Sequence, residues 1–215
     1  MQSLFITATG TNVGKTYTTL QLIRLLADRG IRPGVYKPIE TGVTSEAPDA
    51  STLLKACQAV NPAFDTLTVS DITAYTFELP AAPFCADRDK VVNLQHIVDK
   101  HDMLLKKCDL LLVEGAGGLM VPITETYMMI NLIKELEAKA LLVTPSRLGC
   151  INDTLLSIMA LKTFDIDFEW CVNLYENRED FRSATQPYYD AVFPDWWETD
   201  HGLEHFVTRL LESRR

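Results

Sequence analysis

The glycine-rich stretch at residues 10–16 is the first candidate for chemistry. It follows a short β-rich run at residues 3–8 and opens a helical pattern at residues 15–28. In that context a loop aims backbone N–H groups, at the positive end of a helix, toward an anion. Lys15 suits the β- and γ-phosphates of a nucleoside triphosphate, and the Thr16 hydroxyl suits Mg²⁺. The predicted nucleotide-binding residues of this loop are Thr11, Asn12, Val13, Gly14, Lys15 and Thr16.

The spacing departs from the usual phosphate-loop pattern G-x-x-x-x-G-K-[ST]. Its first glycine would fall at Thr9 and stands instead at Gly10. The alternative interpretation is an ordinary strand-to-helix turn that carries Gly-Lys-Thr by chance.

Charged residues follow two further predicted strands, at residues 32–37 and 109–113. Ligands of an open α/β sheet bind beyond the carboxyl ends of its strands. Glu114 closes a wholly apolar strand, where a carboxylate is costly unless it meets a cation. We therefore predict Glu114 as a ligand of the Mg²⁺ on Thr16, against the alternative that it caps the glycine N–H groups after it. Lys37 ends the other strand, and its alternative is a solvated lysine.

Two helix starts add further candidates. Asp49 stands where an N-cap precedes a helical segment, so we expect it to be held there. Residues 149–152 lie between a predicted strand at 140–144 and a helix, and their N–H groups suit a carboxylate. A thiolate nucleophile at Cys150 is an alternative, but no histidine lies close to it in sequence.

These residues need a sheet that brings several strand ends together. Strand patterns at residues 3–8, 32–37, 109–113, 140–144 and 168–174 alternate with helical patterns, and residues 61–90 form an irregular excursion. Further helices are expected at residues 93–107, 128–137, 179–192 and 202–213. We predict one α/β domain over residues 1–215, with a mostly parallel sheet flanked by helices.

Composition excludes several classes of protein. The 215 residues include 20 Lys and Arg against 29 Asp and Glu, a formal net charge of −9, and no long basic run. A nucleic-acid partner is therefore not expected, because binding its backbone needs a positive stripe. The apolar stretches are too short for a bilayer, and no signal peptide precedes the first strand, so we expect no membrane partner and a cytoplasmic location. Five cysteines without a C-x-x-C pair indicate neither disulfides nor a thiolate zinc site.

Five separated motifs occur together in one order. They are Gly14-Lys15-Thr16, Tyr36-Lys37-Pro38 with Thr41-Gly42, Pro48-Asp49-Ala50, Glu114-Gly115-Ala116-Gly117-Gly118 and Leu148-Gly149-Cys150-Ile151-Asn152. In these the chain resembles the dethiobiotin synthetase family over about residues 1–175. The resemblance implies a homodimeric ligase that uses Mg²⁺ and ATP to close the ureido ring of dethiobiotin from 7,8-diaminononanoate and CO₂, through a carbamate and a carbamic-phosphoric anhydride.

The resemblance also implies a role for each matching residue. Lys15, Lys37 and Thr41 would be catalytic, and Thr16, Asp49 and Glu114 would hold Mg²⁺. Gly117 and Asn173 would join the nucleotide site. The distant carboxylate of the substrate would dock on Gly149, Cys150, Ile151 and Asn152, and a tyrosine of the partner subunit, Tyr188 or Tyr189, would reach over it.

Three departures from the family pattern carry expectations. Asn12 replaces a glutamate near the metal, which would loosen Mg²⁺ binding, and Ala8 replaces a glycine. Beyond Asn173 the base-reading loop is replaced by residues 193–197 and a short helix. We therefore expect weak discrimination between ATP and other triphosphates.

Two rival functions remain. A partition-type switch ATPase shares the phosphate loop, but this chain has Gly10 where such proteins carry a signature lysine. A metalloprotease is the second, because residues 201–205 read His-Gly-Leu-Glu-His and match H-x-x-E-H. An exposed amphipathic helix is the simpler explanation of that match.

Overall fold

A five-stranded parallel sheet forms the centre of the computed structural model, which describes residues 2–213. The strands are β1 (Ser3–Ala8), β2 (Pro33–Tyr36), β5 (Leu110–Glu114), β6 (Lys139–Pro145) and β7 (Phe168–Asn173). Their spatial order is β2-β5-β1-β6-β7. Every residue of β1 and β5 is buried, as expected for central parallel strands covered on both faces. The predicted α/β architecture is confirmed.

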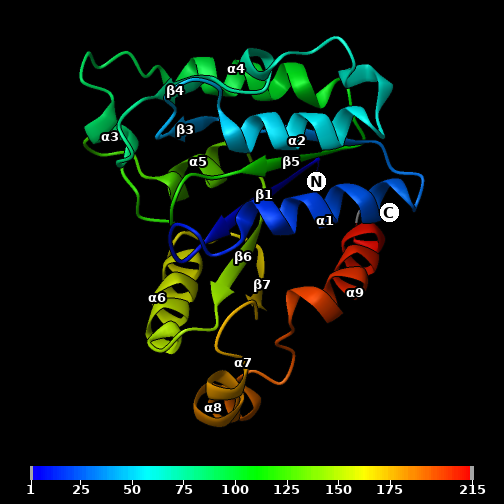
Figure 1. The fold of residues 1–215 in the computed structure, drawn as a ribbon, viewed down its shortest axis with the longest axis vertical. Coiled ribbons are helices and arrows are strands. Elements are labelled where there is room, and N and C mark those ends of the chain that lie inside the picture. Colours follow the sequence, from blue (N-terminus) through cyan, green and yellow to red (C-terminus); the bar gives the residue numbers. More distant parts are fainter. Residues whose placement is uncertain (1, 214–215) are drawn as a thin grey trace.

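Helices cover this sheet (Figure 1). The longer ones are α1 (Lys15–Ala27), α2 (Pro48–Gln58), α4 (Leu94–Leu105), α5 (Met129–Glu135), α6 (Cys150–Thr163) and α9 (Thr199–Glu212). The shorter ones are α3 (Pro83–Ala86), α7 (Arg178–Asp180) and α8 (Gln186–Val192), and one π-helical turn at Phe181–Thr185 joins the last two. α1 packs against α2 and against the distant α9, so the last long helix returns to the first.

A second, two-stranded sheet joins two segments. Residues 39–48 have the Gly, Ser and Pro content of a loop, whereas residues 73–77 are predicted to be a short extended piece of the excursion. β3 (Ile39–Thr41) pairs in parallel with β4 (Tyr75–Phe77). Strands of three residues are too short to show an alternating pattern, so the loop prediction for β3 was wrong. The excursion at residues 61–90 is otherwise irregular, with 3-10 turns at Pro62–Phe64 and Val69–Asp71. Phe64 in the first turn and Ile72 directly after the second are buried in the core.

The helix starts need two corrections. α2 begins at Pro48 with Ala47 as its N-cap, so Asp49 lies inside the first turn and is not the cap. α9 begins at Thr199, three residues before the predicted start at residue 202.

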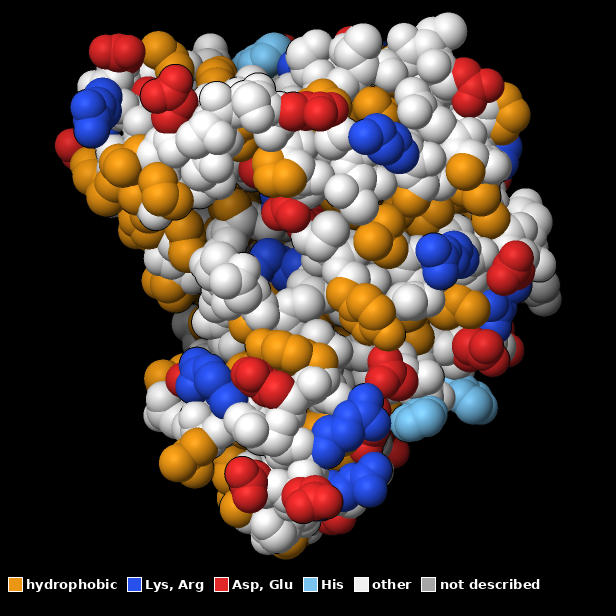
Figure 2. Space-filling view, viewed as in Figure 1, with side chains coloured by type: hydrophobic (Ala, Val, Ile, Leu, Met, Phe, Trp, Pro, Cys, Tyr) orange, Lys and Arg blue, Asp and Glu red, His pale blue; other side chains and the backbone are white. Residues whose placement is uncertain are grey.

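The surface carries charges of both signs. On the face seen in Figure 2, Lys and Arg side chains are interspersed with Asp and Glu, and those drawn there form no continuous basic stripe. No two cysteines among residues 2–213 form a disulfide. Within residues 2–213, no helix combines the length and apolar character that crossing a membrane requires.

Candidate active site

The phosphate loop joins β1 to α1 and is braced from β7. Gly14 has φ +106°, a conformation that L side chains rarely adopt, and it caps α1. The Asn173 side chain donates a hydrogen bond to the Val13 carbonyl oxygen at 2.9 Å. A Cβ atom on Gly14 would lie 2.0 Å from the Asn173 amide nitrogen. The loop and Asn173 therefore fit together only with glycine at position 14.

Lys15 bridges the two glycine-rich loops. Its Nζ donates to the Gly10 carbonyl at 2.9 Å and to the Gly117 carbonyl at 3.0 Å. Burial and the neighbouring charge of Lys37 lower the pKa of Lys15 to about 8. The ammonium group is thus held between carbonyl oxygens at the mouth of the loop, where a phosphate could replace those contacts.

Glu114 is the centre of a buried polar cluster. It is 0% exposed, and its Oε1 accepts hydrogen bonds from the Thr16 hydroxyl at 2.9 Å and from Lys37 Nζ at 2.8 Å. The Thr19 hydroxyl donates to its Oε2 at 2.8 Å. Burial alone disfavours the charged form of Lys37, but the nearby carboxylates, Glu114 first, outweigh it and raise the pKa of Lys37. Lys37 therefore stays protonated and places a positive charge beside Glu114. The sequence predicted a cation at this position but assigned it to Mg²⁺.

Glu40 anchors the helix that carries Asp49. Its two carboxylate oxygens accept the backbone N–H groups of Asp49 and Ala50, each at 2.9 Å. Asp49 Oδ2 then lies 3.4 Å from Lys37 Nζ. Burial raises the pKa of Glu40, against the lowering effect of these two hydrogen bonds. Glu40 was not predicted from the sequence, where it is only a charged residue in the loop-like segment at residues 39–48.

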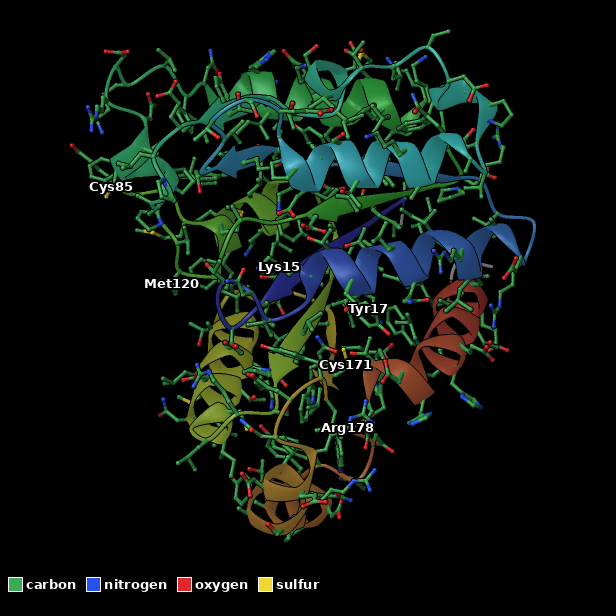
Figure 3. The ribbon with its side chains drawn as sticks, viewed as in Figure 1. Lys15, Tyr17, Cys85, Met120, Cys171 and Arg178 are labelled. Atoms are coloured by element: carbon green, nitrogen blue, oxygen red, sulfur yellow. The ribbon has the colours of Figure 1, made fainter. Side chains whose placement is uncertain are left out.

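One cavity of about 400 Å³ gathers most of the predicted residues. Its lining comprises Thr11, Asn12, Gly14, Lys15, Thr16, Tyr17, Lys37, Glu40, Thr41, Asp49, Ala116 and Gly117. Figure 3 shows Lys15 at the start of α1, beside the loops that close this space. Glu114 contacts this cavity through Thr16, whereas Asn173 braces the loop through the Val13 carbonyl. Glu114 contacts both Thr16 and Lys37, and Asp49 contacts Lys37, so three hard oxygen donors of the kind that Mg²⁺ prefers lie close together.

Comparisons with known proteins identify the family to which this chain belongs. A family described as an AAA domain matches residues 2–172. The chain is 60% identical over 210 residues to the ATP-dependent dethiobiotin synthetase BioD of Sulfurovum sp. (strain NBC37-1), covering 98% of this chain and 100% of that relative. The chain belongs to the dethiobiotin synthetase family. A relative of the same name from Wolinella succinogenes is 36% identical over 99% of this chain and 100% of its own length. The resemblance predicted from the motifs is confirmed.

Solved structures share the fold of this dethiobiotin synthetase family member at low identity. A plasmid partition protein from Borrelia burgdorferi has a TM-score of 0.57 at 10% identity, covering 97% of this chain and 98% of that one. The MinC:MinD cell division protein complex of Aquifex aeolicus has a TM-score of 0.52 at 17% identity, covering 89% and 76%. Likeness at such identity shows the fold alone.

The segment predicted for the substrate carboxylate lies apart from the cavity. None of residues 149–152 lines it, and the Cys150 N–H is already bonded to the Arg147 carbonyl at 3.1 Å. The prediction of a fully free set of N–H groups was therefore wrong at Cys150. Its thiol is buried and 3.9 Å from the Thr185 hydroxyl. Nothing in these contacts activates it as a nucleophile.

The two candidate tyrosines differ sharply in exposure. Tyr189 is fully buried, and its hydroxyl donates to the Thr154 hydroxyl at 3.0 Å within the same chain. Tyr188 is 38% exposed. Only Tyr188 is therefore placed to contact another subunit or a ligand.

The H-x-x-E-H match forms no metal centre. His201 and His205 are exposed on α9. Within the described part of the chain, no group of three or more His, Cys, Asp or Glu side chains is placed to hold a metal ion. The metalloprotease alternative therefore has no structural support.

Proposed function

We propose that this enzyme makes dethiobiotin from 7,8-diaminononanoate and CO₂, using ATP to drive closure of the ureido ring. The observation that carries the proposal is the convergence of Lys15, Lys37, Thr41 and the phosphate loop on one cavity. The near full-length identity to named ATP-dependent dethiobiotin synthetases supports it. The chemistry is phosphoryl transfer followed by acyl transfer.

The first half of the reaction makes a good leaving group. One amine adds to CO₂ and loses a proton, giving a carbamate. A carbamate oxygen attacks the γ-phosphorus of ATP, the bond from that phosphorus to the β–γ bridging oxygen breaks, and ADP leaves. Charge on the transferring group is neutralised by Lys15 and Lys37, and the Thr41 hydroxyl orients the carbamate.

The second half closes the ring. The second amine attacks the carbonyl carbon of the mixed anhydride, the C–O bond breaks, and phosphate is released. Lys37 is suited to hold the departing phosphate because its ion pair with Glu114 keeps it protonated.

Mg²⁺ belongs to this proposal through the oxygens that fit it. Thr16, Asp49 and Glu114 would hold the ion, which when bound would draw negative charge from the phosphate oxygens. Lys37 contacts both carboxylates of this set, at 2.8 Å from Glu114 and 3.4 Å from Asp49. Lys37 thereby holds the two carboxylates of the proposed metal site close to its own ammonium group.

A homodimer would complete the site. Leu148 is 89% exposed, and Leu156 and Met159 on α6 are 57% and 62% exposed, beside the segment predicted to bind the substrate carboxylate. Exposed apolar side chains gathered on one helix are typical of an interface. We propose that a second copy covers this face and that residues 149–152 and Tyr188 then serve a site shared between subunits. Met159→Lys should shift the protein from dimer to monomer in light-scattering measurements, and a dimer of unchanged strength would contradict this.

The test of the proposed function is substrate-dependent phosphate release. With ATP, Mg²⁺ and bicarbonate, 7,8-diaminononanoate should provoke hydrolysis with one phosphate formed per dethiobiotin. Omission of the diamine should leave only background release. Hydrolysis that ignores the diamine would favour the alternative, a partition-type switch ATPase, whose fold this chain shares.

A further inference from the structure

A second cavity of about 500 Å³ adjoins the phosphate-loop cavity. It is lined by Asn12, Gly14, Tyr17, Asn173, Tyr175, Arg178 and Asp200. Three of these residues, Asn12, Gly14 and Tyr17, also line the first cavity. A ligand whose phosphates occupy the loop can therefore extend directly into this second space, and the two tyrosines supply flat apolar walls that suit a nucleobase.

Asp200 is the only carboxylate among the described residues that line this second cavity, and it is held from two sides. The Tyr17 hydroxyl donates to Asp200 Oδ1 at 2.9 Å, and Arg178 Nη2 donates to Oδ2 at 3.0 Å. The hydrogen bond to Asp200 raises the pKa of Tyr17, so the phenol stays a donor at neutral pH. Figure 3 shows Tyr17 on α1 and Arg178 at the start of α7, and Asp200 comes from α9. Contacts from α1 and α7 therefore fix the position of the Asp200 carboxylate on α9.

Asn173, which the family resemblance assigns to the base, has its amide nitrogen engaged elsewhere. That nitrogen donates to the Val13 carbonyl, and the residue is 5% exposed. The Tyr175 hydroxyl likewise donates its hydrogen bond to the Asn12 carbonyl, at 3.1 Å. Because each oxygen of Asp200 can accept a further hydrogen bond, the carboxylate is the strongest remaining acceptor in the cavity.

We propose that Asp200 selects the base of the nucleoside triphosphate in this cavity by the amino group at C6 of adenine or C4 of cytosine. The inference rests on the proposed function for the identity of the phosphate-bearing ligand. A carboxylate only accepts hydrogen bonds, so it attracts the amino group at C6 of adenine or C4 of cytosine. It repels the carbonyl oxygen that hypoxanthine or uracil carries at the same place. Arg178 beside it can donate to the adjacent ring nitrogen of the amino bases.

A base-selecting Asp200 would restrict the nucleotides that the enzyme accepts more than the sequence alone predicts. The usual base-reading loop is missing after Asn173, which predicted weak discrimination among triphosphates. Tyr17, Arg178 and Asp200 instead supply a different wall. ATP and CTP should therefore both be used, whereas ITP and UTP should be poor substrates.

Steady-state kinetics with ATP and ITP test this directly, since the two bases differ only at C6 and in the proton that hypoxanthine carries on the adjacent N1. The unmodified enzyme should show kcat/KM at least about tenfold higher for ATP, the effect of one hydrogen bond to a charged acceptor. Asp200→Asn should bring the ratio to within about threefold of one, because an amide can donate as well as accept. Glu204→Gln, on the same helix, is the matched control and should leave the ratio unchanged.

A second variant and a binding measurement complete the test. Tyr17→Phe keeps the Asp200 carboxylate but removes one of its two hydrogen bonds, so the preference for ATP should fall partway. This variant tests the role of Asp200 even if Asp200→Asn does not fold. Calorimetric affinities for ATP and ITP without diamine report base selection apart from turnover. An enzyme that binds ATP selectively but makes no dethiobiotin would refute the proposed function alone. Equal affinity for both nucleotides, or a ratio that Asp200→Asn leaves unchanged, would refute the role of Asp200.

Discussion

Replacing Glu40 with glutamine should destabilise the protein out of proportion to the size of the change. Each carboxylate oxygen of Glu40 accepts one backbone N–H of α2, at 2.9 Å, and the side chain is 3% exposed. Glutamine keeps one acceptor and turns an NH₂ group toward the other N–H. Loss of a charge-assisted hydrogen bond with an unpaired buried donor costs about 1.5–3 kcal/mol.

The expected magnitude lies at the lower end of that range. Burial raises the pKa of Glu40, which shows that the native carboxylate already bears a desolvation cost that glutamine avoids. We therefore expect about 1.5–2 kcal/mol, or a fall in Tm of about 3–8 °C for a domain of this size. Asp49, freed from its anchor, should also lose its position near Lys37, so turnover should require more Mg²⁺.

Thermal unfolding followed by circular dichroism, with turnover measured against Mg²⁺ concentration, checks both effects. Glu46→Gln is the matched control, because this exposed neighbour accepts only the Ser51 hydroxyl, at 2.7 Å. It should change Tm by less than about 2 °C. If Glu40→Gln melted with the unmodified protein and kept its Mg²⁺ dependence, the anchoring role assigned to Glu40 would be wrong.

Three more predictions follow from the same contacts. Gly14→Ala should abolish ATP binding in calorimetry, and adding Asn173→Ala should restore it only in part, because the close contact is relieved but φ +106° is not; full recovery would show that backbone strain is unimportant. Lys15→Ala should fold normally and weaken ATP affinity by about tenfold to a hundredfold, and an unchanged affinity would exclude Lys15 from the phosphate site. Burial lowers the pKa of His101, so the unfolded chain takes up its proton first and stability should fall as pH drops below about 6.5. His101→Gln should flatten that slope in urea titrations, and a slope that persisted would have to come from another group.

Local patterns predicted the parts of the site that lie at strand ends. Lys37 and Glu114 each end or follow an apolar strand, and parallel strands bring their carboxyl ends to one edge of the sheet. Their meeting at 2.8 Å also requires β2 and β5 to be neighbours in the sheet, an order that the alternation of elements does not give.

Contacts across long distances in the chain were out of reach of such patterns. Tyr17 and Asp200 are 183 residues apart and meet only because α9 folds back on α1. Glu40 was missed for a different reason, since a three-residue strand carries too few residues to reveal its pairing. Tyr189 is buried in a small cluster that no sequence periodicity predicts. The sequence alone therefore could not show that Tyr188 is the exposed tyrosine of the pair.

In the proposed reaction an oxygen from CO₂ attacks the terminal phosphorus of ATP, and ¹⁸O-labelled bicarbonate follows that oxygen. Ring closure breaks the bond between the carbonyl carbon and that oxygen, so we expect one ¹⁸O atom in each inorganic phosphate released, measured by mass spectrometry with freshly added label. Phosphate that carries oxygen only from ATP and water, while dethiobiotin still forms, would contradict the carbamate route through this site.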